Sequence, residues 1–93
     1  MSRRMFRYSV PIDDEPHAFS LTGQPVAVAA REHGNFYTEA EFWAEHDDSV
    51  STASRYVQVF GTGHPLPDDA RWIGTCPRTA DGLVWHLYEV TQP

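Results

Sequence analysis

The residues with the clearest capacity for chemistry are the turn Gly61-Thr62-Gly63-His64, a second histidine, His86, and the single cysteine, Cys76. A glycine-rich turn can bind an anion through its backbone amides, and two histidines with a thiolate could supply three ligands to zinc. The chain has no lysine, no phosphate-binding G-x-x-x-x-G-K-[ST] sequence and no short C-x-x-C or H-x-x-x-H spacing. We therefore predict no cofactor and no metal ion, and we interpret the turn as structural.

Catalysis by an acid, a base or a nucleophile is also weakly indicated. Thr62 and Thr75 have no base at a fixed spacing, although an activated hydroxyl needs a base and an orienting group. Glu39 and Glu41 would lie on one face of a strand, where solvated side chains explain them better than a general acid and base. We therefore predict that the protein is not an enzyme. The alternative is a small hydrolase or ligand-binding protein that uses the glycine-rich turn together with His86.

Length and charge limit the class of protein. The 93 residues, of which 41% are hydrophobic, suffice for one small domain over residues 1–93. The net charge of -6 disfavours a surface that follows nucleic-acid phosphates. No apolar run approaches the length of a membrane span or of a signal peptide, and a lone cysteine is typical of a reducing compartment. We therefore expect no nucleic-acid partner, no membrane span and a cytoplasmic location.

The N-terminal part of the chain is predicted to form three strands. Residues 5–10 and 17–21 alternate apolar and polar side chains. The two strands could pair as a hairpin across the turn Asp13-Asp14-Glu15-Pro16. Pro11 lacks a backbone N–H, so the first strand should end there or lie at a sheet edge. Residues 26–31 are apolar on both faces, which predicts a central strand.

Residues 36–46 fit two patterns. Thr38 and Glu41 have the spacing of a helix capping box, which would begin a short helix. The side chains also alternate strictly in character from 36 to 45, and Gly34-Asn35 stands where a hairpin connection would stand. We therefore predict a strand here.

The C-terminal part contains the clearest strands. Tyr56–Phe60 is β-branched and aromatic, Arg71–Ile73 is short, and Leu83–Val90 is apolar on both faces. We place the first and the last of these at the centre of a sheet. About six to seven short strands predict a mainly β fold, either a small antiparallel β-sandwich or an open barrel. The short helix near residues 38–46 remains the one alternative element.

Three segments of the C-terminal part resemble a known family. They are Phe60-Gly61-Thr62-Gly63-His64-Pro65-Leu66-Pro67, Trp72-Ile73-Gly74-Thr75 and Leu83-Val84-Trp85-His86-Leu87-Tyr88-Glu89. In combination they resemble a family of small uncharacterised proteins of actinobacterial phages and their hosts. Phe6-Arg7-Tyr8 and Phe42-Trp43-Ala44 are similar to that family's first strand and to its strand before the Gly-Thr-Gly-His element. The resemblance implies a phage-type source and a β-rich fold, and it implies no catalytic residue.

Surface recognition is the function that these observations favour. Aromatic residues make up 13% of the chain, more than a small core readily hides, and Trp and Tyr commonly anchor protein interfaces. Tyr37, Trp43, Trp72 and Trp85 are therefore candidates for an exposed patch. We predict a non-enzymatic phage-type protein that binds a host protein in the cytoplasm of the bacterial host cell, for host takeover, exclusion of competing phages or counter-defence. Homodimerisation through an edge strand is a further candidate. The binding residues that we expect are Tyr37, Phe42, Trp43, Glu45, Asp47 and Asp48.

Overall fold

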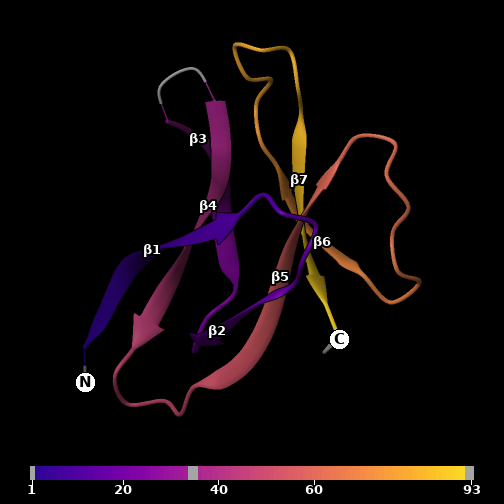
Figure 1. Ribbon diagram of the computed structural model, residues 1–93. Helices are drawn as coiled ribbons and strands as arrows, with labels where there is room; N and C mark the ends of the chain where they lie inside the picture. Colours follow the sequence, from indigo (N-terminus) through magenta and orange to yellow (C-terminus); the bar gives the residue numbers. More distant parts are fainter. Residues whose placement is uncertain (1, 34–35, 92–93) are drawn as a thin grey trace.

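The protein is a sandwich of two antiparallel sheets, shown as a computed structural model in Figure 1. The structure describes residues 2–33 and 36–91, with only the backbone of His33, Phe36 and Tyr37. The strands in this part of the chain are β1 (Arg3–Pro11), β2 (His17–Leu21), β3 (Pro25–His33), β4 (Phe36–Asp47), β5 (Ala53–Gly61), β6 (Arg71–Thr75) and β7 (Trp85–Val90).

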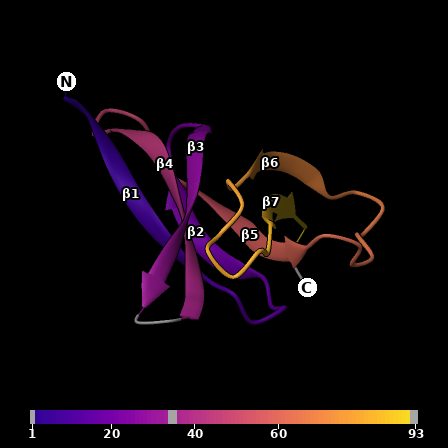
Figure 2. The same ribbon diagram turned by 90° about the horizontal axis from the view of Figure 1, so that it is seen from above.

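The strands divide into a three-stranded sheet, in the order β1-β4-β3, and a four-stranded sheet, in the order β2-β5-β7-β6. Figure 2 shows β1, β3 and β4 on one side and β5, β6 and β7 on the other. All neighbouring strands run antiparallel. The predicted mainly β sandwich is therefore confirmed, and the open-barrel alternative is not, because the strands form two separate sheets.

The segment with two competing patterns is a strand, β4, as predicted. Ala40, Phe42 and Ala44 face the core and have no exposed surface, while Trp43 and Glu45 alternate with them on the outer face. No helix occurs in residues 2–33 and 36–91. The segment forms a strand and not a helix because the alternating pattern places three apolar side chains of one strand in the core together.

Two predicted features of the N-terminal part are wrong. β1 pairs with β4 and β2 pairs with β5, so the expected hairpin of the first two strands does not form. Instead these strands belong to opposite sheets, and Tyr8 of β1 meets Phe19 of β2 edge to face, with ring centroids 6.0 Å apart. β3 is an edge strand, not a central one. Its exposed apolar residues include Val26, 64% exposed, and Ala27, while Ala29 is half-buried.

The C-terminal strands occupy the predicted places. β5 and β7 are the two central strands of the four-stranded sheet, and they bury Val57, Val59 and Leu87 against the three-stranded sheet. The last strand is shorter than expected, because Leu83 lies in a turn where its carbonyl accepts a hydrogen bond from the Thr79 amide at 2.9 Å. Pro11 does end β1, which is also an edge strand.

The two sheets approach most closely where β6 faces β3. A Cβ atom at Gly74 of β6 would lie 2.8 Å and 3.0 Å from the two methyl carbons of Val28 on β3. Contacts this short do not occur between real side chains, and the stiff β-branched valine has little freedom to turn away. Gly74 is therefore required by the closeness of the sheets.

We expect Gly74→Ala to destabilise the fold by about 1 to 3 kcal/mol, because a methyl group overfills a closed contact. The same substitution in a Val28→Ala background should cost much less, since the truncated side chain leaves room for the new methyl. Urea unfolding of the wild type, both single variants and the double variant gives the coupling energy directly. Strictly additive effects of the two substitutions would contradict this account of the contact.

Candidate functional site

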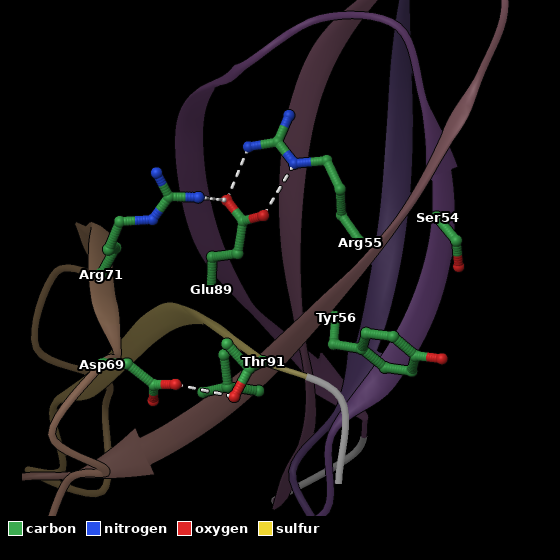
Figure 3. A pocket seen from close by; sticks show the side chains of 8 residues that line it. Ser54, Arg55, Tyr56, Asp69, Arg71, Glu89 and Thr91 are labelled. Carbon is green, nitrogen blue, oxygen red and sulfur yellow. Dashed lines mark hydrogen bonds and ion pairs between the residues drawn. The ribbon is translucent and has the colours of Figure 1, made fainter.

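One polar cluster lies at an edge of the inner space between the sheets (Figure 3). Arg55 of β5 donates from Nε and Nη2 to the two carboxylate oxygens of Glu89 on β7, at 2.9 Å and 2.6 Å. Arg71 of β6 approaches the same carboxylate, with Nη2 3.3 Å from Oε1. Together with Asp69 and Thr91, these residues line a surface hollow of about 300 Å³. The arrangement is a forked ion pair with a second, exposed guanidinium at its side.

The Arg55–Glu89 pair is primarily structural. Arg55 also donates to the Gly23 carbonyl at 3.2 Å and to the Gln24 side chain at 2.8 Å, and so fastens the segment by which the chain crosses from β2 to β3. The hydrogen bond from Arg55 lowers the pKa of Glu89 and raises the pKa of Arg55 itself. Since the carboxylates of Glu89 and Asp69 balance the two guanidinium groups that line the hollow, the hollow offers little attraction to an anionic ligand.

A second set of polar residues holds an exposed tryptophan on the outer face of the four-stranded sheet. Trp72 of β6 is 63% exposed, and its indole Nε1 donates to Thr75 Oγ1 at 3.0 Å. Thr75 Oγ1 lies 2.9 Å from Nδ1 of His86, and Nε2 of His86 lies 2.8 Å from Thr62 Oγ1. The last hydroxyl donates to the Val84 carbonyl at 3.4 Å. Four side chains from β6, β7 and the turn after β5 thus form one chain of hydrogen bonds.

This series of hydrogen bonds has a fixed direction at Trp72. An indole N–H can only donate, so Thr75 accepts from Trp72. The donor and acceptor roles in the two contacts of His86 depend on which ring nitrogen carries the proton. Both ring nitrogens of His86 therefore contact threonine hydroxyls.

The Gly61-Thr62-Gly63-His64 segment is a tight turn closed on itself. The His64 amide donates to the Gly61 carbonyl at 3.2 Å, and the Gly61 amide donates to Nδ1 of the His64 ring at 3.3 Å. Gly63 has φ of 90°, a conformation that favours glycine. The turn lies between two surface hollows, of about 270 Å³ toward Trp85 and about 150 Å³ toward Tyr88.

Among residues 2–33 and 36–91, no group of three His, Cys, Asp or Glu side chains could hold a metal ion. Cys76 is buried, and its burial raises the pKa of the thiol to about 11.

The family of the chain follows from comparison with known sequences. A family described as a domain of unknown function (DUF7352) matches residues 1–93. The chain belongs to this family. No match was found among curated proteins or among solved structures. Within the described part of this DUF7352 chain no helix could cross a membrane.

The binding residues expected from the sequence of this DUF7352 domain lie on both faces of β4 and in the turn after it. Phe42 has no exposed surface, while its neighbour Trp43 is half-buried on the opposite face, which it shares with Glu45. Glu45 and Asp47 line a hollow of about 370 Å³ with Arg3. Asp48 is exposed, with Oδ1 3.6 Å from Nε2 of His46. The side chain of Tyr37 lies outside the described residues.

One further expectation for the domain is wrong. Glu41, expected to be solvated, is only 8% exposed, with its Oε2 3.3 Å from Nε of Arg7. It lies at the middle of the central strand, opposite Ser9 of β1 and Ala29 of β3, and neighbours on both sides remove it from water. Glu39 on the same face is half-buried.

Two features of the DUF7352 domain were not predicted at all. Arg55 and Glu89 are 34 residues apart in sequence, and only the pairing of β5 with β7 makes them neighbours. The chain from Trp72 to Thr62 likewise depends on β6 and β7 lying side by side. The sequence signal is limited to the two motifs at 72–75 and 83–89, which contain Trp72, Thr75 and His86, and no local pattern connects these two motifs.

Proposed function

We propose that the protein is a non-enzymatic binding module for another protein, with Trp72 as the central contact residue. The observation that supports this most directly is the combination of 63% exposure with a fixed indole orientation. Exposed tryptophans are among the residues that dominate binding energy at protein interfaces. Because the hydrogen bonds through Thr75 and His86 already orient the ring, little side-chain freedom is lost when a partner covers it.

The surroundings of Trp72 suit a protein partner. Leu66, 44% exposed, lies in the segment between β5 and β6 and lines the smaller hollow with Phe60 and Tyr88. Tyr88 stands directly opposite Trp72 in the β6–β7 ladder. Apolar and aromatic side chains therefore extend from the edge of the sheet toward its centre. Aromatic side chains are enriched at protein interfaces.

We further propose a host protein as the partner and a phage-type role in host takeover, exclusion of competing phages or counter-defence, in the cytoplasm of the bacterial cell. The support is the resemblance of residues 60–67, 72–75 and 83–89 to small proteins of actinobacterial phages and their hosts. The second of these segments contains Trp72 and Thr75, and the third contains Tyr88 and His86, which lie beside them in the β6–β7 ladder.

The enzymatic alternative uses the contact between Thr62 and His86, which at 2.8 Å is short enough for proton transfer. Its support is this distance together with the hollows on each side of the turn. Against it, His86 takes its orientation from threonine hydroxyls and not from a carboxylate that would orient a base. Holding Trp72 is the better explanation of the same four side chains.

We expect Trp72→Ala to weaken partner binding by about 2 kcal/mol or more, roughly thirtyfold in Kd, while changing the stability of the fold by less than about 1 kcal/mol. The partner is first captured from an actinobacterial lysate with the wild-type protein, then purified and titrated by calorimetry. Leu83→Ala is the matched control, because it removes another exposed apolar side chain, 49% exposed, from a different turn. A partner that binds Trp72→Ala as tightly as wild type, or that is lost on Trp43→Ala instead, would contradict the proposal.

A further inference from the structure

The two sheets have four edge strands, and β1 differs from the other three. β2 and β6 have five residues each, and β6 is further broken by a register shift between Trp72 and Gly74. β3 has nine residues but two register shifts along β4. β1 pairs with β4 without a shift over all nine residues from Arg3 to Pro11. Short length and bulges protect an edge from pairing with another chain, so β1 is the edge that lacks both protections.

The open side of β1 offers regularly spaced hydrogen-bonding groups. In an antiparallel pair, every second residue of an edge strand directs its N–H and C=O away from its partner. Because β4 is the neighbour of β1 on one side only, these groups face outward along the strand. A segment in extended conformation can satisfy them by adding as a further strand.

The side chains of β1 favour an acidic segment. Arg3 and Arg7 lie on the outer face, where their side chains are 69% and 58% exposed although Glu45 and Glu41 are near. Arg4 lies on the other face and has no ion-pair partner among the described residues. Beside it, Phe6 is 37% exposed and stacks on His46, with ring centroids 5.1 Å apart. Three of the seven basic residues of a chain with net charge -6 thus lie on this one strand.

We propose that β1 is a docking strand that takes up an extended segment of a partner protein, with carboxylates on the face of Arg3 and Arg7 and apolar residues on the face of Phe6. Alternate residues of a strand point to opposite faces, so the recognised pattern is acidic and apolar in alternation. This surface is separate from Trp72 and does not depend on it. Glu45 and Glu41 of β4 lie 3.5 Å and 3.3 Å from Arg3 and Arg7. A strand added to the open side of β1 would lie beside the exposed arginines and one strand further from these carboxylates.

A second copy of the chain fits this edge less well than an acidic segment does. Two β1 strands paired along their open sides would bring Arg3, Arg4 and Arg7 of both copies into one seam, and like charges that face each other across strands are destabilising. A partner with carboxylates relieves this repulsion and gains cross-strand ion pairs instead.

The test uses a synthetic peptide in which glutamate and valine alternate, titrated into the ¹⁵N-labelled full chain up to about 1 mM, which detects weak binding. We expect amide shifts confined to β1 and β4. A peptide with lysine in place of glutamate, and one N-methylated at alternate residues so that it cannot pair, should cause none. Replacing Arg3, Arg4 and Arg7 together by alanine should weaken binding roughly tenfold, whereas Arg31→Ala, on the opposite edge of the same sheet, should have no effect.

Each other outcome overturns the proposal. Absence of shifts in β1, equal binding of the N-methylated peptide, or concentration-dependent β1 shifts without peptide, which would indicate self-pairing, all exclude the acidic docking strand. Trp72→Ala should bind the peptide as the wild type does. If the peptide does not bind while a partner still binds through Trp72, the docking-strand proposal is wrong and the proposed function stands.

Discussion

Phe42→Ala should destabilise the protein by about 3 to 5 kcal/mol, the largest effect that we expect from a single substitution. The ring has no exposed surface. It stacks on Tyr8, with centroids 4.9 Å apart, and meets Phe19 edge to face at 5.1 Å. These three rings come from β4, β1 and β2, so the cluster joins both sheets, and its loss leaves a cavity that no single strand can close.

The measurement is urea unfolding followed by tryptophan fluorescence, with Trp43→Phe as a control for the signal. Small domains have a total stability of about 5 to 15 kcal/mol, so Phe42→Ala can leave the protein only marginally folded. Trp43→Ala, one residue away on the opposite face and half-buried, should cost much less. Equal costs for the two substitutions would contradict the assignment of Phe42 to the core. If a Phe42 variant no longer binds a partner protein, the cause is therefore unfolding and not the loss of a direct contact.

Removing one partner of the Arg55–Glu89 pair should cost about 2 to 3 kcal/mol. Both side chains are only 16% exposed, so Glu89→Gln leaves a guanidinium without its full countercharge, and Arg55→Met leaves a carboxylate and the Gly23 carbonyl without donors. The double variant should lose less than the sum of the two single variants. Arg71→Met, whose side chain is 75% exposed near the same carboxylate, is the matched control and should have little effect.

The same pair predicts how stability depends on pH. The hydrogen bond from Arg55 lowers the pKa of Glu89 from its ordinary value of 4.5. The stabilisation is therefore fully present above pH 4.5 and is lost as the pH falls through the lowered pKa of the folded state. Urea midpoints of wild type and Glu89→Gln should converge as the pH falls below 4.5. A constant difference across that range would show that the Glu89 charge does not stabilise the fold.

Local alternation of side chains was sufficient to predict the strands but not their partners. β4, β5 and β7 follow from patterns within each segment, and the central places of β5 and β7 follow from apolar residues on both faces. The predicted hairpin of residues 5–10 and 17–21 does not form, because strands that are neighbours in sequence can belong to opposite sheets. The pattern within a strand does not indicate to which sheet the strand belongs. β3 was wrongly predicted to be a central strand because alanines on an exposed face give the same apolar sequence pattern as residues on a buried face.

The candidate site was predictable only in part, for a related reason. Trp72 was among the tryptophans expected at the surface, but its fixed orientation depends on Thr75 and His86, which the β6–β7 ladder brings together. At β4 both Phe42 and Trp43 were expected to bind a partner. They are adjacent aromatic residues on opposite faces of the strand, so only one of them can face the core. The sequence pattern that identified the strand could not say which face of it the four-stranded sheet covers.

The crossing of the chain between the sheets also affects the order in which the protein can fold during synthesis. Arg3 pairs with Asp47 and His17 pairs with Val57, so β1 and β2 leave the ribosome long before β4 and β5 exist. Non-local pairing of this kind slows folding, and the early strands remain unpaired in the meantime. The β3–β4 hairpin can form first, and β1 adds to it afterwards. Until then the arginines of β1 disfavour pairing between the β1 strands of two nascent copies of the chain.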